Sequence, residues 1–364
     1  MDKHYMQRAL ELAAKAKGRT SPNPMVGAVV VRDGEVVGQG YHARAGTPHA
    51  EVVALKQAGD KARGATLYVT LEPCCHYGRT GPCTEAVIQA GVKRVVVAAT
   101  DPNPLVSGKG IKVLREAGLE VISGVMDNES RQLNEVFNKY ITSKLPFVVV
   151  KVAMTMDGKI ATAAGESQWI TCTESRRETH RLRDQYDAIL VGIGTVLADD
   201  PSLTTRLPDK EGRDPVRIVL DGQARTPPRC KMLNQHSPAP TYIIVSNSAP
   251  PGNIKELEAA GARVIPLKSD QNGIKLTELL KWLGEKQISS LLVEGGSSVH
   301  GSFLAEGLVD KVAWFVAPKI IGGYDAPGPV GGKGVKSLKD ALLLEQIDVS
   351  MCGRDLFIQG YVQK

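Results

Sequence analysis

Residues 72–83 read Glu-Pro-Cys-Cys-His-Tyr-Gly-Arg-Thr-Gly-Pro-Cys, and residues 49–51 upstream read His-Ala-Glu. These two stretches offer one imidazole, up to three thiolates and a carboxylate. Three nitrogen or sulfur ligands with one open coordination position are the arrangement that holds a catalytic zinc ion. The pattern therefore predicts a catalytic zinc site, and the alternative is a structural zinc closed by four ligands.

Both stretches lead into predicted helices. Pro48 helps to open the first helix, on which His49 and Glu51 are about 200° apart, so only one of them need bind the metal. The other can act as a base. Cys83 opens the second helix, where free N–H groups and the helix dipole lower the pKa of a thiol and favour the thiolate.

The elements around the cysteines alternate between helical and extended patterns, which predicts a three-layer α/β sandwich. Asp33-Gly34 favours a tight hairpin between the first two strands. We expect helices at about 2–17, 49–59, from 83, up to 118 and at 128–143, and strands at 26–32, 36–40, 65–71, 94–99 and 120–122.

A chain of 364 residues predicts two domains. The long helix at about 128–143 ends before Pro146, and the β-branched run that starts at Phe147 begins a new buried strand. We therefore divide the chain into residues 1–144 and 145–364. Further apolar strands are expected at 188–191, 216–220, 241–245, 289–293 and 312–316.

Composition excludes several classes of protein. No stretch approaches the ~18 apolar residues of a membrane span, and the N-terminus lacks the apolar centre of a secretory signal. Six cysteines are too few for a disulfide scaffold in a chain of this length, so we expect a cytoplasmic protein. A net charge of +6 with 5% aromatic residues suits an anionic small substrate better than a nucleic acid.

The His-x-Glu and Pro-Cys…Cys elements resemble the cytidine deaminase superfamily, over about residues 1–145. That superfamily usually has Cys-x-x-Cys, whereas eight residues separate Cys74 from Cys83 here. The long spacing, with the stretch Ser21–Gly27, looks like the pyrimidine deaminases of riboflavin biosynthesis. Adjacent Cys74 and Cys75 would strain to chelate one ion, so we assign His49, Cys74 and Cys83 to the metal.

This resemblance implies a deaminase mechanism. Zinc lowers the pKa of a water that attacks the ring carbon bearing the amino group, and Glu51 is the catalytic residue that moves protons to the ring nitrogen and the leaving ammonia. The resemblance also implies a set of side chains that hold the pyrimidine. These are Asn23, His42, His76, Asp101 and Asn103.

The second half lacks a Gly-x-Gly-x-x-Gly turn after a strand, so an ordinary dinucleotide fold is not expected. It has another glycine-rich turn, Glu294–Gly301, which follows the strand at 289–293 and leads into a helix. Free backbone N–H groups at such a helix start attract phosphate. A simple tight turn is the alternative.

Three more stretches, Lys151–Ala161, Gly165–Thr171 and Val191–Arg206, accompany this turn. Together the four look like the reductases of riboflavin biosynthesis, which have a dihydrofolate-reductase-like α/β fold, over about residues 147–360. Met154-Thr155-Met156 departs from the usual sequence of these reductases at this position, which is a small residue followed by Ser-Leu. The resemblance implies NADPH contacts by Ala153, Trp169, Thr195, Asp199, Gly295, Gly296, Ser297, Ser298 and Gly301, and substrate contacts by Ser167, Arg183, Leu203, Arg206 and Glu294.

Some of these residues have other interpretations. Arg183 and Arg206 suit a phosphate clamp because a guanidinium fork binds phosphate in two places, but Arg183 could instead form a surface ion pair within a charged helix. Trp169 could be ordinary core packing. Lys151 and Glu294 are both candidates for supplying a proton, and the sequence does not choose between them.

Together the two resemblances imply a bifunctional enzyme of riboflavin biosynthesis, with zinc in residues 1–144 and NADPH in residues 145–364. The first domain would deaminate 2,5-diamino-6-ribosylamino-4(3H)-pyrimidinone 5′-phosphate, and the second would reduce the resulting 5-amino-6-(5-phosphoribosylamino)uracil. Small phosphorylated pyrimidines, a homo-oligomer and no nucleic acid or membrane partner are expected. The alternatives are a tRNA or nucleoside deaminase with an appended domain, and a zinc-stabilised dinucleotide sensor without turnover.

Overall fold

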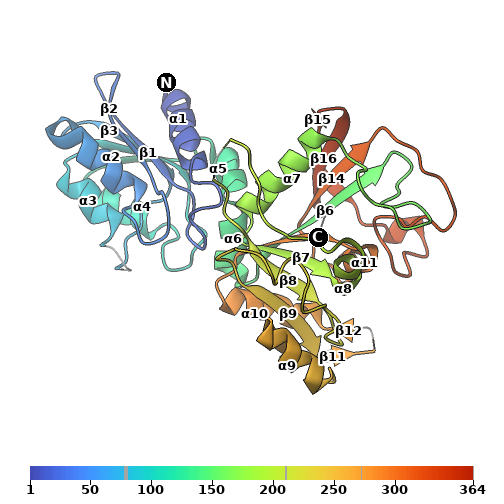
Figure 1. Ribbon diagram of the computed structural model, residues 1–364. Helices are drawn as coiled ribbons and strands as arrows, with labels where there is room; N and C mark the ends of the chain where they lie inside the picture. Colours follow the sequence, from blue (N-terminus) through green and yellow to red (C-terminus); the bar gives the residue numbers. More distant parts are fainter. Residues whose placement is uncertain (78–80, 210, 272, 364) are drawn as a thin grey trace. The chain divides into compact units, whose positions relative to one another are not determined.

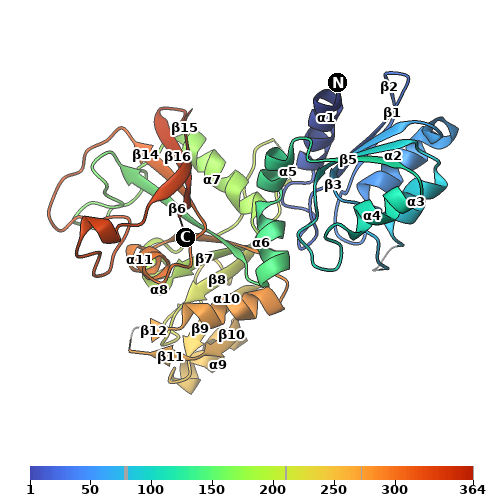
Figure 2. The same cartoon turned by 180° about the vertical axis from the view of Figure 1, so that it is seen from behind.

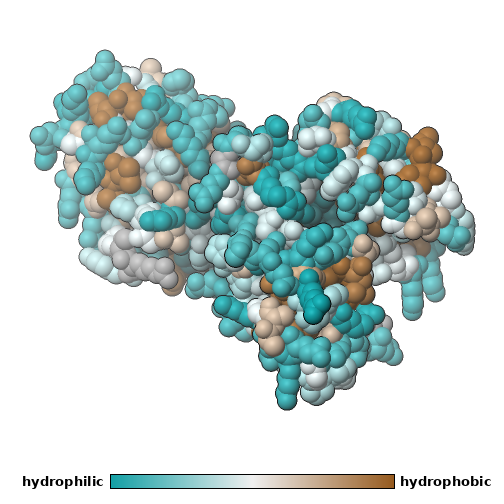
Figure 3. All heavy atoms as spheres, in the orientation of Figure 1, coloured by the Kyte–Doolittle hydropathy of each residue, from teal (hydrophilic) through white to brown (hydrophobic). Residues whose placement is uncertain are grey.

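The computed structural model describes residues 1–77, 81–209, 211–271 and 273–363. The chain divides into two compact units, Met1–Leu145 and Pro146–Lys364, each built around its own β-sheet (Figures 1 and 2). The face drawn in Figure 3 is mostly hydrophilic, with separate hydrophobic patches. Within the described ranges, no helix combines the length and apolar character needed to cross a membrane.

The first unit contains a five-stranded sheet of order β2-β1-β3-β4-β5. Its strands are β1 (Gly27–Arg32), β2 (Glu35–Tyr41), β3 (Thr66–Leu71), β4 (Arg94–Ala99) and β5 (Glu120–Ser123). β1 runs antiparallel to β2 and β3, whereas β3, β4 and β5 are parallel. Asp33 and Gly34 form the hairpin turn with φ of 51° and 83°, the left-handed backbone that such a turn needs.

Helices cover both faces of this sheet. Successive residues of a strand point to opposite faces, so Ala28 and Val30 pack with one set of helices and Val29 and Val31 with the other. The first set is α2 (Ala50–Ala58), α3 (Cys83–Gln89) and α4 (Lys109–Glu116), and the second is α1 (Asp2–Ala14) and α5 (Asp127–Leu133). A 3₁₀ turn, η1 (Gly59–Ala62), follows α2. The predicted three-layer sandwich is confirmed.

One predicted helix is wrong. The stretch 128–143 forms two helices, α5 and α6 (Glu135–Ser143), which are separated at Asn134. The Asn134 side chain accepts a hydrogen bond from the backbone N–H of Met25 (2.8 Å) and donates one to its carbonyl (2.9 Å). An asparagine that pairs with distant backbone competes with helix continuation, and the sequence does not reveal this partner.

The second unit contains a nine-stranded mixed sheet of order β10-β9-β8-β7-β13-β6-β14-β16-β15. Neighbours from β10 to β14 are parallel, and β14, β16 and β15 are antiparallel. The strands are β6 (Phe147–Thr155), β7 (Ala188–Gly192), β8 (Val216–Leu220), β9 (Thr241–Ser246), β10 (Arg263–Leu267), β13 (Ser290–Gly295), β14 (Lys311–Ala317), β15 (Leu344–Cys352) and β16 (Asp355–Val362), with a small separate pair, β11 (Ser269–Asp270) and β12 (Gly273–Ile274).

Helices connect many of these strands. They are α7 (Thr173–Gln185), α8 (Ile193–Asp199), α9 (Pro251–Ala259), α10 (Leu276–Glu285) and α11 (Ser297–Ala305), with a 3₁₀ turn η2 (Leu338–Asp340). All six predicted strands of this half are present. The hairpin of β15 and β16 was not predicted, although the alternation Ile347-Asp-Val-Ser-Met351 is a strand signal. Most of β15 is exposed, so it lacks the long apolar run of the buried strands.

Candidate active sites

The predicted metal ligands meet at the end of β3. His49 is the residue before α2, Cys74 follows β3, and Cys83 is the first residue of α3. One ligand atom from each lies within 4.8 Å of the others, and His49 Nδ1 is 3.0 Å from Cys83 Sγ and 3.6 Å from Cys74 Sγ. Two thiols and an imidazole at these distances fit zinc, whose bonds to sulfur and nitrogen are about 2.0–2.3 Å long.

The backbone N–H at the start of α3 stabilises the thiolate of Cys74, and not that of Cys83 as the sequence predicted. The N–H of Cys83 donates to Cys74 Sγ at 3.3 Å. Hydrogen bonds from Cys83 and His49 lower the pKa of Cys74 to about 4. The pKa of Cys83 is raised by its hydrogen bond to Cys74 and by burial. The amide at the start of α3 thus stabilises negative charge on Cys74, which the spacing of the cysteines did not indicate.

Glu51 lies on the first turn of α2, beside the metal ligands, and only 3% of it is exposed. Burial raises the pKa of its carboxyl group, and the negative charge of Cys74 raises it further. A raised pKa makes the carboxyl group hold a proton more readily, which suits a residue that both accepts and donates protons.

Asn23 and His42 are brought together next to this centre. Asn23 Nδ2 lies 3.1 Å from His42 Nε2, and His42 Nδ1 lies 3.2 Å from the carbonyl of Pro48. The His42 ring also meets the His49 ring edge to face, at 5.3 Å between centroids. Burial lowers the pKa of His42, which favours the neutral ring, and a neutral ring that donates from Nδ1 to Pro48 can accept from the Asn23 amide at Nε2.

The other three predicted substrate residues differ in exposure. Asp101 is buried, and burial raises its pKa to about 6 although the N–H of Asn103 donates to its Oδ1 at 2.8 Å. Asn103 Oδ1 accepts from the N–H of Leu105, so part of this side chain shapes the loop. His76 is exposed, and its electrostatic effect on Asp101 is to lower the pKa of that carboxyl group, against the larger effect of burial.

In the second unit, the glycine-rich turn opens α11. Gly296 is the residue before the helix, and Ser297 and Ser298 form its first turn. Thr195, on α8, has its hydroxyl oxygen against this turn, because a side chain on Gly296 would meet that oxygen at 3.3 Å. Gly301 is required by packing, since a Cβ there would lie 2.1 Å from the carbonyl oxygen of Gly331.

A buried ion cluster lies at the start of this turn. Arg183 donates two parallel hydrogen bonds to Glu294, of 2.7 and 2.8 Å, and Lys151 Nζ is 3.8 Å from the same carboxylate. The fork of Arg183 therefore holds Glu294 and does not form a surface ion pair. Burial alone would raise the pKa of Glu294, but Arg183 and Lys151 hold it at about 2, while burial lowers the pKa of Lys151.

The second predicted clamp, Arg206, is exposed and donates to the Thr204 hydroxyl at 2.8 Å. His180 was not predicted, yet its Nδ1 accepts from the N–H of Arg206 at 3.2 Å. Burial and the charges of Arg183 and Arg206 lower the pKa of His180 to about 4. Leu203 packs in the apolar core of this unit, so its side chain does not face an open site.

The remaining predicted cofactor residues lie on separate elements. Ala153 is half-buried on β6, and Asp199 Oδ1 accepts from the Ser167 hydroxyl at 3.1 Å. Trp169 is 63% exposed, so it is not core packing. Its ring lies 4.7 Å from the Arg176 guanidinium, a cation–π geometry, and it lines a cavity of about 450 Å³.

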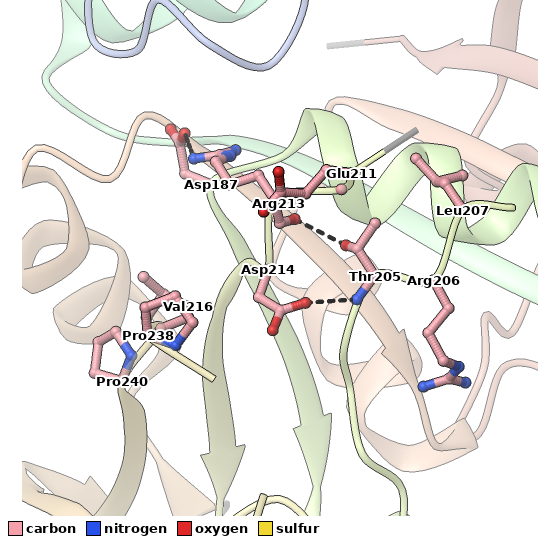
Figure 4. A pocket seen from close by; sticks show the side chains of 12 residues that line it. Asp187, Thr205, Arg206, Leu207, Glu211, Arg213, Asp214, Val216, Pro238 and Pro240 are labelled. Carbon is pink, nitrogen blue, oxygen red and sulfur yellow. Dashed lines mark hydrogen bonds and ion pairs between the residues drawn. The ribbon is translucent and has the colours of Figure 1, made fainter. Parts of the chain in front are cut away.

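A cavity of about 630 Å³ lies near the amino ends of β7, β8 and β9 (Figure 4). Asp214 Oδ1 accepts from the N–H of Thr205, and Arg213 pairs with Asp187 at 3.4 Å. The Arg206 side chain points away from Asp214 and Arg213 in Figure 4. The glycine-rich turn follows the carboxyl end of β13, which is parallel to β7, so this cavity is not the cofactor crevice.

Family models match both units of the chain. Residues 146–358 match the RibD C-terminal domain, and residues 1–99 match the cytidine and deoxycytidylate deaminase zinc-binding region. The riboflavin biosynthesis protein RibD of Aquifex aeolicus is 50% identical over 98% of this chain and 98% of its own length. RibD of Escherichia coli is 43% identical, again over 98% of each chain.

Solved structures match the whole chain as well. RibD of Acinetobacter baumannii has a TM-score of 0.89 and 38% identity, covering 100% of this chain and 99% of its own. A deaminase/reductase from Thermotoga maritima has a TM-score of 0.86 and 39% identity, with the same coverage. The chain therefore belongs to the RibD family of bifunctional riboflavin biosynthesis enzymes, with a zinc-binding deaminase domain and a reductase domain of the NADPH-using type.

Proposed function

We propose that residues 1–144 deaminate 2,5-diamino-6-ribosylamino-4(3H)-pyrimidinone 5′-phosphate and that residues 145–364 reduce 5-amino-6-(5-phosphoribosylamino)uracil. The cluster of His49, Cys74 and Cys83 beside the buried Glu51 carries the first assignment. The Thermotoga maritima relative is described as a diaminohydroxyphosphoribosylaminopyrimidine deaminase and 5-amino-6-(5-phosphoribosylamino)uracil reductase, which supports both substrates. Matches over both units favour this pair of reactions over a tRNA deaminase or a dinucleotide sensor.

In the deaminase, His49, Cys74 and Cys83 would hold zinc, which acts as a Lewis acid and lowers the pKa of water. Glu51 takes one proton from the attacking water and delivers it to the ring nitrogen. It then takes the second proton from the hydroxyl group added to the ring carbon and gives it to the amino group, which leaves as ammonia. The raised pKa of Glu51 suits this shuttle because the carboxyl group must accept and release a proton twice. The paired Asn23 and His42 would orient the ring.

In the reductase, NADPH supplies the hydride for C1′ of the ribose. The turn Gly295–Gly301 would bind the phosphates of the cofactor through its backbone N–H groups. Glu294, with a pKa of about 2, carries no proton near neutral pH. Lys151 is the other candidate, and its Nζ lies 3.8 Å from the Glu294 carboxylate, so we assign to Lys151 the proton that the ribose ring oxygen receives as the ring opens. Arg206 is the better phosphate clamp, because Arg183 is occupied by Glu294.

We also propose that the enzyme is a cytoplasmic homo-oligomer. All six cysteines are free thiols, which is typical of a reducing compartment. β15 ends the nine-stranded sheet, so one of its edges offers backbone hydrogen bonds to another chain. Ile347, Val349 and Met351 on this strand are 54%, 56% and 63% exposed. A second copy that pairs along β15 would cover these side chains.

The first prediction concerns Glu51. The unaltered protein should release ammonia from the diaminopyrimidine with or without NADPH, and should consume NADPH only after deamination. Glu51→Gln should keep its zinc and lose about 10²–10⁴-fold in ammonia release, because the amide cannot shuttle protons. Reduction of the deaminated substrate by the same variant is the internal control. Unchanged ammonia release would overturn the role of Glu51.

The second prediction concerns the metal ligands. Cys83→Ala should lose zinc, because it removes one of three ligand atoms that lie within 4.8 Å of one another. Cys75→Ala is the matched control and should keep zinc. Metal analysis of both purified variants measures the result, and zinc loss in Cys75→Ala alone would reassign the site.

The third prediction concerns Lys151. Lys151→Gln should reduce NADPH oxidation by about 10²–10⁴-fold while NADPH binding, followed by fluorescence, persists. Because burial lowers the pKa of Lys151, the activity of the unaltered enzyme should fall as pH rises, and at a lower pH than for a free lysine. Lys281→Gln, an exposed lysine on α10, is the control. Full activity of Lys151→Gln would exclude it as the proton donor.

The fourth prediction concerns β15. Sedimentation should give the unaltered protein a mass of at least twice 39.0 kDa. Val349→Lys should shift the population toward the single chain, because it places a charge on the exposed apolar edge. Val335→Lys, at a position that is 57% exposed but lies outside this strand, should not. A single chain in the unaltered protein would disprove the pairing.

A further inference from the structure

Glu72 is a buried acid that the reaction does not use. It follows β3 and precedes Pro73 and the metal ligand Cys74. Only 3% of Glu72 is exposed. A buried carboxylate is costly unless hydrogen bonds satisfy its oxygens, so its partners indicate what it holds in place.

Three backbone N–H groups donate to the Glu72 carboxylate. Those of Asp101 and Gly108 donate to Oε2, at 3.2 and 2.9 Å, and that of Ile111 donates to Oε1 at 3.1 Å. Gly108 precedes α4 and Ile111 lies in its first turn, where N–H groups lack partners within the helix. Glu72, which follows β3, therefore caps the start of α4 and also binds the loop that precedes this helix.

The start of α4 packs directly on the metal-ligand segment. A Cβ at Gly110 would lie 2.1 Å from the carbonyl oxygen of Pro73 and 3.2 Å from Glu72 Oε1. Only glycine permits this approach. The segment from Asp101 to Gly110 is thus held at both of its ends against the residues that lead into Cys74.

We propose that Glu72 is a positioning residue of the deaminase, which holds the Asp101–Gly108 loop at the zinc centre so that Asp101 and Asn103 face the pyrimidine. This inference rests on the proposed deaminase function. Glu72 acts through the backbone of the loop and does not touch the substrate. Substrate affinity should depend on it more strongly than zinc binding does, because the zinc ligands do not belong to the loop.

Glu72→Gln tests the role with little change in volume. The glutamine amide has an NH₂ group in place of one carboxylate oxygen, so it cannot accept hydrogen bonds from all three backbone N–H groups. In the zinc-loaded full chain, the amides of Asp101, Gly108 and Ile111 should exchange hydrogen at least about tenfold faster. KM for the diaminopyrimidine should rise about 10–100-fold, the loss expected from a small misplacement of binding groups. The zinc content and the reductase activity should stay unchanged.

Asp2→Asn is the matched control. Asp2 is the first residue of α1, in the layer on the other face of the sheet, and its carboxylate accepts from Arg94 on β4 and Tyr68 on β3. This variant should lose stability and keep its KM, so a KM effect of Glu72→Gln would not be a general consequence of weaker folding. Gly110→Ala disturbs the same contact by another route and should also raise KM. It decides the question if Glu72→Gln fails to fold.

The outcomes separate the two proposals. If the unaltered protein does not deaminate the diaminopyrimidine, the proposed substrate is wrong, and hydrogen exchange still tests whether Glu72 holds the loop. If the protein deaminates it and Glu72→Gln leaves both KM and amide exchange unchanged, the positioning role is wrong. Loss of zinc in Glu72→Gln would also overturn it, because Glu72 would then support the metal ligands instead of the loop.

Discussion

The parallel pairing of β3 with β4 is the constraint on which the deaminase site depends. Leu71 and Ala99 are paired in the register of these strands, so the segments that follow β3 and β4 leave the sheet at the same edge. Cys74 follows one strand and Asp101 the other. His49, which precedes α2, and Cys83, which begins α3, lie beside Cys74. Groups from four distant segments meet because the carboxyl ends of neighbouring parallel strands share one edge.

The reductase unit uses the same arrangement with other chemistry. β7 and β13 are parallel neighbours, and α8 and α11 begin where these strands end. Helix starts collected at one sheet edge present free backbone N–H groups, which are suited to binding phosphates. The cluster of Lys151, Arg183 and Glu294 lies at this edge too, and its burial makes the charges depend on one another: Glu294 stays ionised because two cations face it.

Much of the fold was predicted from the sequence because its strands are buried and its turns are distinctive. Residues 147–150 and 95–99 are apolar throughout, so these runs had few other interpretations. The prediction failed where a distant partner decided the outcome. Asn134 ends a helix because its side chain pairs with the backbone of Met25, and the exposed strand β15 lacks the apolar run of a buried one.

The sequence by itself determined the donor set of the zinc site, the glycine-rich turn and the division into two units, because these follow from residue chemistry and local spacing. Only the tertiary structure decided that the Cys83 amide serves Cys74, that Arg183 holds Glu294, and that Glu72 reaches the loop before α4. Each of these contacts joins separate segments of the chain. The strength of these contacts depends on their burial and on the orientation of donor and acceptor, and the spacing of residues along the sequence encodes neither.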